Sequence, residues 1–110
     1  MTHLHHVEAD VDVRLAQVPV IMDFWDDENS TVFLGDLNAK PDSAEMQLIA
    51  EAGLVDAWIE AGAGSGYTDA SNYPVKRIDF IWHSADLETV EIEVIQTQAS
   101  DHMPVIATLK

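Results

Sequence analysis

Polar side chains that can perform acid–base or metal chemistry stand where short apolar runs begin or end. Asp36 and Asn38 follow the run TVFLG, and Asp79 lies between apolar residues in RIDFIW. Asp101 and His102 come directly before the last apolar run, in SDHMPV. Carboxylate and amide oxygens are ligands for Mg²⁺, Mn²⁺ or Ca²⁺, and an acid–histidine pair supplies a proton donor or acceptor. Brought together, these residues would form a site for a hard cation and a phosphate.

Each of these positions also has a purely structural interpretation. Asp36 and Asn38 are residue types that shape turns by bonding their own backbone. Asp79 could pair with Arg77 or Lys76 at a sheet edge, although an acid within an apolar strand risks burial and then needs a partner. The segment SDHMP fits a turn before a proline. Taken one at a time, none of these motifs decides between the two interpretations.

Two segments have the residue pattern of helices. Apolar residues from 13 to 25 recur at helical spacing, although Pro19 should break or kink that helix near its middle. A second helix is predicted to begin at Ala44, after an Asp-Ser pair that can cap it, and to stop at Gly53. The following LVDAWIEAG predicts another helical turn or two.

Four further segments read as strands: TVFLGD, RIDFIWH, LETVEIEVIQT and PVIATL. The Gly/Ser/Asn/Pro-rich segment AGSGYTDASNYPVK reads as a loop, and loops of that length in a compact domain are often functional. Neighbouring strands pair about 4.8 Å apart, so residues at their ends can converge on one rim. The sequence therefore predicts one mixed α/β domain over residues 1–110, with the polar motifs on one rim of its sheet.

The charge is the unusual bulk property of the chain. Its 110 residues carry 20 acids and 5 bases, a formal net charge of −15. Such a surface repels nucleic acid, so long DNA is disfavoured as a partner, whereas divalent cations accept carboxylate ligands. The alternative is a solvated acidic surface with no specific ligand.

Composition excludes several classes of protein. With no cysteine, the chain has neither a disulfide framework nor a thiolate metal site. There is no apolar run of the ~20 residues that a membrane span needs. The N-terminal MTHLHHVEAD lacks the basic start and apolar middle of a signal peptide, so the cytoplasm is the default expectation.

The ordered set THL, GDLNA, RIDFIW and SDHMPV resembles the endonuclease/exonuclease/phosphatase superfamily, also called deoxyribonuclease-I-like. The resemblance covers nearly all of this chain and the C-terminal half of the family's domain. It implies an α/β (α+β) fold: half of a four-layer α/β/β/α sandwich, with one mixed or antiparallel sheet and helices on one face. It also implies metal-dependent hydrolysis of a phosphoester.

The resemblance assigns roles to two residues of GDLNA and to the acid of SDHMPV. Asp36 would orient or deprotonate the attacking water and contact the metal, and Asn38 would bind a phosphate oxygen or hold the nucleophile. Asp101 would lie at or beside the metal, which would be Mg²⁺ or Mn²⁺, with Ca²⁺ as a further candidate.

The histidines take complementary roles in the same resemblance. His102 would contact the scissile phosphate, and Asp79 would hold His102 in the right tautomer. His3, in THL, matches a second histidine that contacts the phosphate. The alternative for His3, as for His5 and His6, is a surface residue near a frayed chain end.

The chain departs from the family pattern because it begins at the strand that carries THL. The family's N-terminal half supplies a Glu that is the principal metal ligand, so we expect the metal site to be weak or incomplete in one chain. It also supplies a second sheet, so we expect an apolar sheet face that is covered by a homodimer or by a separate N-terminal half.

Three functions follow for comparison. The first is a metal-dependent phosphodiesterase, nuclease or phosphatase acting on an unidentified phosphoester. The second is a folded but inactive truncated domain. The third is an acidic cation-binding or interaction module, which predicts carboxylates scattered over the molecule instead of gathered on one rim.

Overall fold

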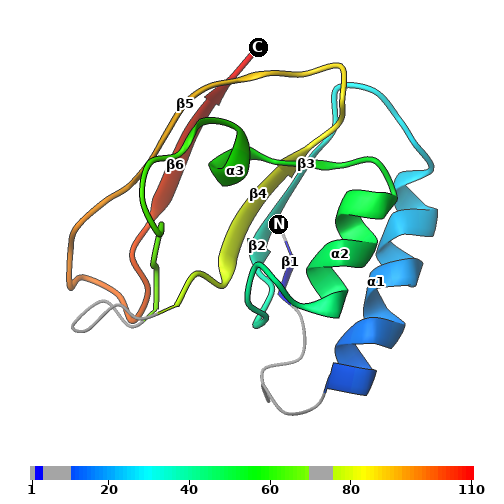
Figure 1. The fold of residues 1–110 in the computed structure, drawn as a ribbon, viewed down its shortest axis with the longest axis horizontal. Coiled ribbons are helices and arrows are strands. Elements are labelled where there is room, and N and C mark those ends of the chain that lie inside the picture. The colour runs from blue at the N-terminus through cyan, green and yellow to red at the C-terminus, as the bar shows by residue number, and fades with distance from the viewer. Residues whose placement is uncertain (1, 4–10, 70–75) are drawn as a thin grey trace.

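The computed structural model describes residues 2–3, 11–69 and 76–110. Figure 1 shows strands in the middle of the molecule with helices beside them. The order along the described chain is β1 (Thr2–His3), α1 (Val11–Trp25), β2 (Val32–Asp36), α2 (Ala44–Glu51), β3 (Val55–Asp56), α3 (Ala57–Ala61), β4 (Asp79–His83), β5 (Thr89–Val94) and β6 (Val105–Leu109). The mixed α/β fold class predicted from the sequence is therefore confirmed.

The strands form two hydrogen-bonded sheets where the sequence suggested one. Four strands pair in the order β1-β2-β4-β3, with β1 parallel to β2 and the other pairs antiparallel. β5 and β6 form a separate antiparallel pair, and β6 runs beside β4 (Figure 1). The ends of β2, β4 and β6 consequently lie near one another, although they are far apart in the sequence.

The helix-side face of the larger sheet carries the core. Phe80 and Trp82 of β4 stack with their ring centroids 6.1 Å apart, and Phe33 of β2 packs against the same cluster. Ile49 of α2 and Val18 of α1 are fully buried in the same cluster. Because every second residue of a strand points to the same face, the intervening residues must point away from the helices.

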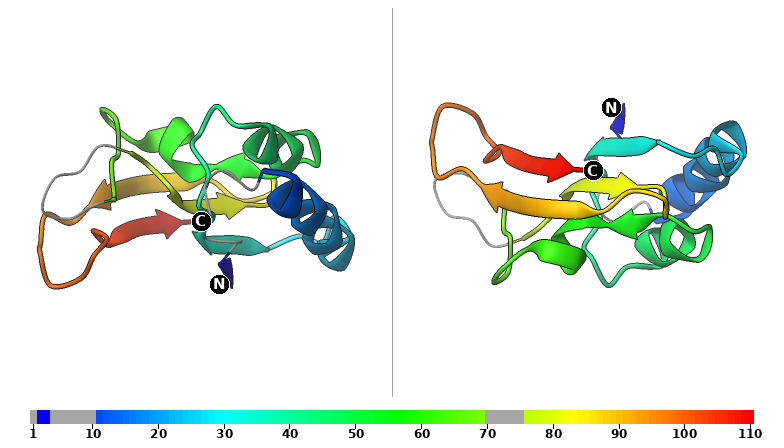
Figure 2. Two further views of the ribbon diagram at one scale, coloured as in Figure 1. Left: turned by 90° about the horizontal axis from the view of Figure 1, so that it is seen from below. Right: turned by 90° about the horizontal axis from the view of Figure 1, so that it is seen from above.

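The opposite face of the larger sheet is also apolar. Leu34 of β2 pairs directly with Ile81 of β4, and both alternate with residues of the core. Figure 2 shows α2 and α3 on one side of the strands and no described helix over the other side. The consecutive apolar residues of these two strands thus give the sheet two apolar faces, as the sequence predicted.

Of the break or kink predicted at Pro19, the break is wrong: α1 is one helix of 15 residues that contains this proline. Pro19 is exposed, so the cost of its missing N–H and its bulky ring falls on the solvent side. Buried Val18 precedes the proline, and Ile21, Met22 and Trp25 after it pack against the core. Tertiary packing on both sides of Pro19 therefore keeps the helix continuous.

The second helix follows its sequence signals closely. α2 begins at Ala44, and the Ser43 side chain caps it by accepting the backbone N–H of Met46 at 3.4 Å. The helix ends at Glu51, and the chain turns at Gly53, whose φ of +111° suits glycine. The next segment forms the short strand β3 and the one-turn helix α3, where the sequence predicted helix alone. No described helix is long and apolar enough to cross a membrane.

Candidate active site

The end of β2 is both a turn and a source of functional groups. The backbone N–H of Asn38 donates to Asp36 Oδ1 at 2.9 Å, and Asn38 takes a left-handed conformation with φ of +51°. Asn and Asp tolerate this conformation better than other non-glycine residues. The turn chemistry proposed for GDLNA is therefore real, and it orients the Asp36 carboxyl group at the same time.

Asp36 and Asp79 face each other across the strand pair. They are direct partners in the antiparallel register of β2 and β4, at the end of one strand and the start of the other. Like charges directly opposite each other destabilise a sheet. A cation between the two carboxylates would relieve this repulsion, and the imidazole of His102 lies close to both of them.

His102 lies among these carboxylates. Its Nδ1 is 2.6 Å from Asp79 Oδ2, which is a short hydrogen bond. Its Nε2 lies 3.3 Å from Asp69 Oδ1 and 3.8 Å from Asp36 Oδ2. The four side chains are 21–28% exposed, so solvent and small ligands reach them.

The surroundings of His102 favour its charged form. Partial burial lowers the pKa of His102, but the hydrogen bond that Asp79 accepts from the ring and the charges of Asp79, Asp36 and Asp69 outweigh it. The net result is a pKa above the ordinary value of 6.5. His102 is thus suited to donate a hydrogen bond or a proton near neutral pH.

The alternative partners considered for Asp79 are engaged elsewhere. Arg77 donates to both carboxylate oxygens of Asp56, at 3.2 and 3.0 Å, and its guanidinium lies over the Phe80 ring. The ammonium of Lys76 lies 3.6 Å from Asp69. The sheet-edge ion pair suggested for Asp79 is therefore wrong, because His102 occupies that carboxylate.

Asp69 is the site residue that sequence reasoning missed. It belongs to a loop in the sequence, and it makes single bridges to Lys76 and to His102 that join this loop to the rim. The local signal is the pair of glycines in GSGYTD, the second of them three residues before Asp69, which indicates a turn at this point of the loop. Nothing local indicates that its carboxylate meets an imidazole 33 residues away.

The other predicted site residues, His3 and Asp101, are placed by their backbone position or exposure. The backbone of His3 in β1 pairs with that of Asp36 in β2, so the first predicted histidine does reach the rim. Asp101 is exposed, and it is not among the ligand atoms that gather with His102. His5 and His6 lie outside the described residues.

Among the described residues, one group has donor atoms close enough together to hold a metal ion. Oxygens of Asp36 and Asp79 and a nitrogen of His102 all lie within 4.8 Å of one another. The group borders a hollow of about 400 Å³ that also reaches Leu34 and Ile81 on the uncovered sheet face. Carboxylates gathered in this way contradict the scattered arrangement expected of an acidic interaction module.

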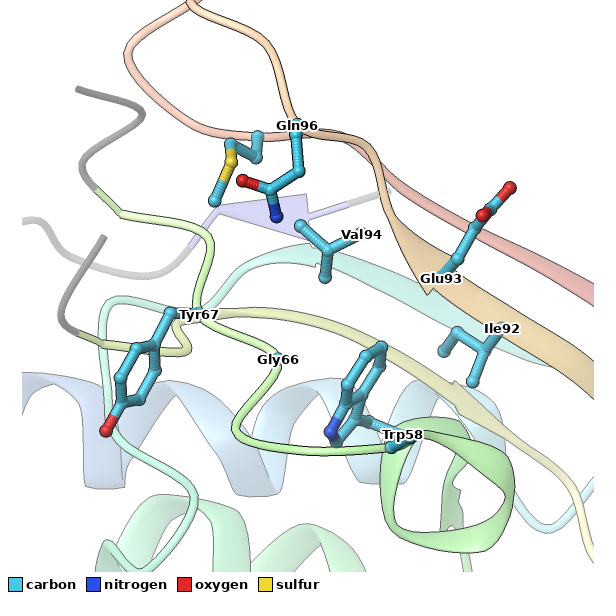
Figure 3. Close-up of a pocket in the computed structure, with 9 residues that line it drawn as sticks. Trp58, Gly66, Tyr67, Ile92, Glu93, Val94 and Gln96 are labelled. Carbon is cyan, nitrogen blue, oxygen red and sulfur yellow. The ribbon is translucent and has the colours of Figure 1, made fainter. Parts of the chain in front are cut away.

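A second hollow, of about 450 Å³, lies on the helix side between β5 and the loop after α3 (Figure 3). Trp58 and Tyr67 line it opposite Val94, and the Trp58 indole N–H donates to the Gly64 carbonyl at 3.0 Å. It contains none of the predicted site residues. Met103 lines both hollows, so the two adjoin, but Asp36, Asp79 and His102 line only the first.

Comparison of the sequence with protein families gives one match. The model of the Endonuclease/Exonuclease/phosphatase family matches residues 8–102, which include Asp36, Asp69, Asp79 and His102. Comparison with curated proteins finds no significant match.

Solved structures share the fold. An endonuclease/exonuclease/phosphatase from Beutenbergia cavernae is 25% identical, with a TM-score of 0.86 over 98% of this chain and 34% of its own. A functionally unknown conserved protein from Enterococcus faecalis is 23% identical, with a TM-score of 0.83 over 99% of this chain and 48% of its own. The mannosyl-6-phosphatase Bt3783 of Bacteroides thetaiotaomicron is 18% identical, with a TM-score of 0.83 over 98% of this chain and 49% of its own. The chain thus spans about half the length, or less, of the solved structures it matches.

Proposed function

The chain belongs to the Endonuclease/Exonuclease/phosphatase family, and from that premise we propose that its strand-end cluster serves metal-dependent hydrolysis of a phosphoester. The observation that carries the proposal is the meeting of Asp36, Asp79 and His102, which come from β2, β4 and the segment before β6. Three such groups on one rim can bind an anionic substrate, a cation and a water molecule together.

In this proposal Asp79 and His102 act as a pair. Asp79 accepts the Nδ1–H of His102, which fixes the ring and turns Nε2 toward the substrate. The imidazolium then donates from Nε2 to a phosphate oxygen and stabilises the charge that develops there. His3, whose backbone pairs with that of Asp36, contributes a second contact to the phosphate.

The proposed role of Asp36 is to receive the proton of the attacking water or to orient that water. Its Oδ1 is already fixed by the backbone of Asn38, and its Oδ2 faces His102. Asn38 lies two residues on and holds the nucleophile or a phosphate oxygen. A base in this position contributes rate factors of roughly 10²–10⁴ in other enzymes.

The donor set fits a hard divalent cation, Mg²⁺ or Mn²⁺, with Ca²⁺ as a weaker candidate. Asp36 would hold it, and Asp101 would contribute from the segment beside His102. When bound, such an ion neutralises charge on the phosphate oxygens. Because the described cluster offers few carboxylates that are not already hydrogen-bonded, we expect weak binding by this chain alone.

We also propose that the uncovered apolar face binds another chain, either a second copy in a homodimer or a separate half of a family domain. Leu34 and Ile81 lie on this face, beside the hollow that contains the carboxylates. Leu34→Lys should abolish association measured by light scattering, whereas Val20→Lys, at a position 69% exposed on α1, should leave it unchanged.

The test of function is hydrolysis of a generic phosphodiester with Mg²⁺ or Mn²⁺, by the chain and by its Asp36→Asn variant. The wild type should turn the diester over, and the variant should lose at least about 10²-fold in rate. Asp23→Asn, a matched change on the exposed surface of α1, should retain full activity. Equal turnover by wild type and Asp36→Asn would refute the proposal.

A further inference from the structure

The Asp69 carboxylate lies close to Nε2 of His102, the ring nitrogen that would donate a hydrogen bond to a bound phosphate. Asp79 occupies Nδ1 at 2.6 Å, so Nε2 is the nitrogen left to meet a phosphate oxygen. Asp69 Oδ1 is 3.3 Å from Nε2, closer than Asp36 Oδ2 at 3.8 Å. Any phosphate that accepts a hydrogen bond from Nε2 therefore lies within a few ångströms of the Asp69 carboxylate.

The backbone fixes Asp69 in this place from two sides. Its N–H donates to the Lys76 carbonyl at 3.1 Å, and the Lys76 N–H donates back to the Asp69 carbonyl at 3.2 Å. The N–H of Met103 donates to the carbonyl of Thr68 at 2.8 Å, which ties the preceding residue to the segment that carries His102. The carboxylate thus faces His102 because the backbone of Asp69 pairs with Lys76 and that of Thr68 pairs with Met103.

Among the described residues, the charge of Asp69 is only partly compensated. Lys76 Nζ lies 3.6 Å away, and the two side chains are 27% and 22% exposed, so water weakens their attraction. His102 is shared with Asp79 and Asp36. A negative charge therefore persists beside the place where a phosphate would bind.

We propose that Asp69 is a specificity-determining residue that makes the His102 site discriminate against doubly charged phosphate monoesters in favour of singly charged phosphodiesters. The inference rests on the proposed function and names the substrate class of that same site. A diester carries one negative charge, whereas a monoester carries nearly two above its second pKa of roughly 6. Each added charge on the ligand is repelled by Asp69, and at a separation of a few ångströms near a protein surface this repulsion changes affinity by about tenfold or more.

The test compares two small esters that differ in charge, dimethyl phosphate and methyl phosphate. Each is titrated at about pH 8, where the monoester is doubly charged, into the whole chain with saturating Mg²⁺. Binding is followed by the NMR signals of the His102 ring. The variants are Asp69→Asn, which keeps the shape and removes the charge, and Lys76→Met, which removes the partially compensating cation.

The expected result is a change in the ratio of the two dissociation constants. Asp69→Asn should lower the dissociation constant of methyl phosphate by a factor about tenfold larger than that of dimethyl phosphate. Lys76→Met should act in the opposite direction and weaken the monoester more than the diester. An intact amide spectrum in both variants shows that the fold is preserved.

Three results would overturn the inference. If both esters bind and the ratio is the same in Asp69→Asn, Asp69 does not select by charge, and the proposed function stands without it. If Asp69→Asn weakens both esters alike, Asp69 supports the fold or the cation instead. If neither ester affects His102 in any variant, the proposed function itself falls, and the inference with it.

Discussion

In the helix-side core, each buried acid has a cation of its own. Glu45 of α2 accepts the Arg14 Nε–H at 2.7 Å, and both side chains are 2% exposed. Asp56 accepts two N–H groups of Arg77, and both of these side chains are 5% exposed. These pairs have the one-to-one matching that buried charges require.

At the strand-end rim, by contrast, three carboxylates lie around one described imidazole, that of His102. Asp36, Asp69 and Asp79 all have an oxygen within 3.8 Å of a ring nitrogen of His102. The ammonium of Lys76 lies 3.6 Å from Asp69 and offsets part of its negative charge. The fold can match acids with bases one to one, as its core demonstrates. Keeping three acids close together costs stability, and such costs concentrate at functional sites.

Two histidines provide the sharpest test of this contrast. His102→Gln should lower the turnover of a phosphodiester by about 10²–10⁴-fold, because the variant cannot supply a charged donor at Nε2. Its free energy of unfolding should also fall, because the three acids lose their imidazolium, but by less than in the core variant below, since these side chains are 21–28% exposed. Turnover and urea denaturation measure the two effects.

His83→Gln is the matched change in the core. His83 is fully buried, with Nε2 2.8 Å from Glu60 and Nδ1 2.9 Å from the Ser84 carbonyl. This variant should lose stability and keep its turnover per folded molecule. The contrast would be broken if His83→Gln lost activity as completely as His102→Gln while remaining folded.

The second largest effect should come from the core ion pair. Arg14→Ala leaves Glu45 buried without its cation and should cost about 3–5 kcal/mol in the free energy of unfolding, measured by denaturation with urea. Replacing both partners, as Arg14→Met with Glu45→Met, should recover most of that loss. A cost below about 1 kcal/mol for Arg14→Ala would mean that this buried ion pair contributes no more to stability than a surface ion pair does.

A divalent cation should stabilise the rim and not the core. Mg²⁺ at about 100 times its dissociation constant should add about 2.7 kcal/mol to the stability of the wild type. Asp36→Asn should abolish this gain, and without metal it should be as stable as the wild type or slightly more so, because one of two opposed charges is gone. Thermal melting with and without Mg²⁺ measures both effects, with Asp23→Asn as the control.

The smallest effect is the dependence of stability on pH. Because the pKa of His102 is raised in the folded state, its contribution to stability is complete below about pH 6.5 and is lost as the pH rises through the folded-state pKa. NMR titration of the metal-free protein should find that pKa above 6.5. Asp79→Asn should lower it, and an unchanged value would mean that Asp79 does not hold the imidazolium.

Much of the fold was predictable because local rules agreed with tertiary packing. Ser43 caps α2 where an Asp-Ser pair indicated a helix start, and β2 and β4 lie within the runs TVFLGD and RIDFIWH and end where those runs end. The rule that strand ends lie together predicted that Asp36, Asp79 and His102 would meet. Pro19 is the exception, because packing of α1 outweighs a local preference against proline.

The sequence by itself determined which chemical groups stand at the strand ends and which strands have apolar side chains on both faces. Residue type and alternation fix these properties without reference to distant residues. Only the tertiary structure decided which cation each acid receives: Arg77 pairs with Asp56 and leaves Asp79 to His102, and Asp69 reaches the same imidazole from a loop. Pairing energies depend on distance and burial, which arise when remote segments pack together, so no local pattern encodes them.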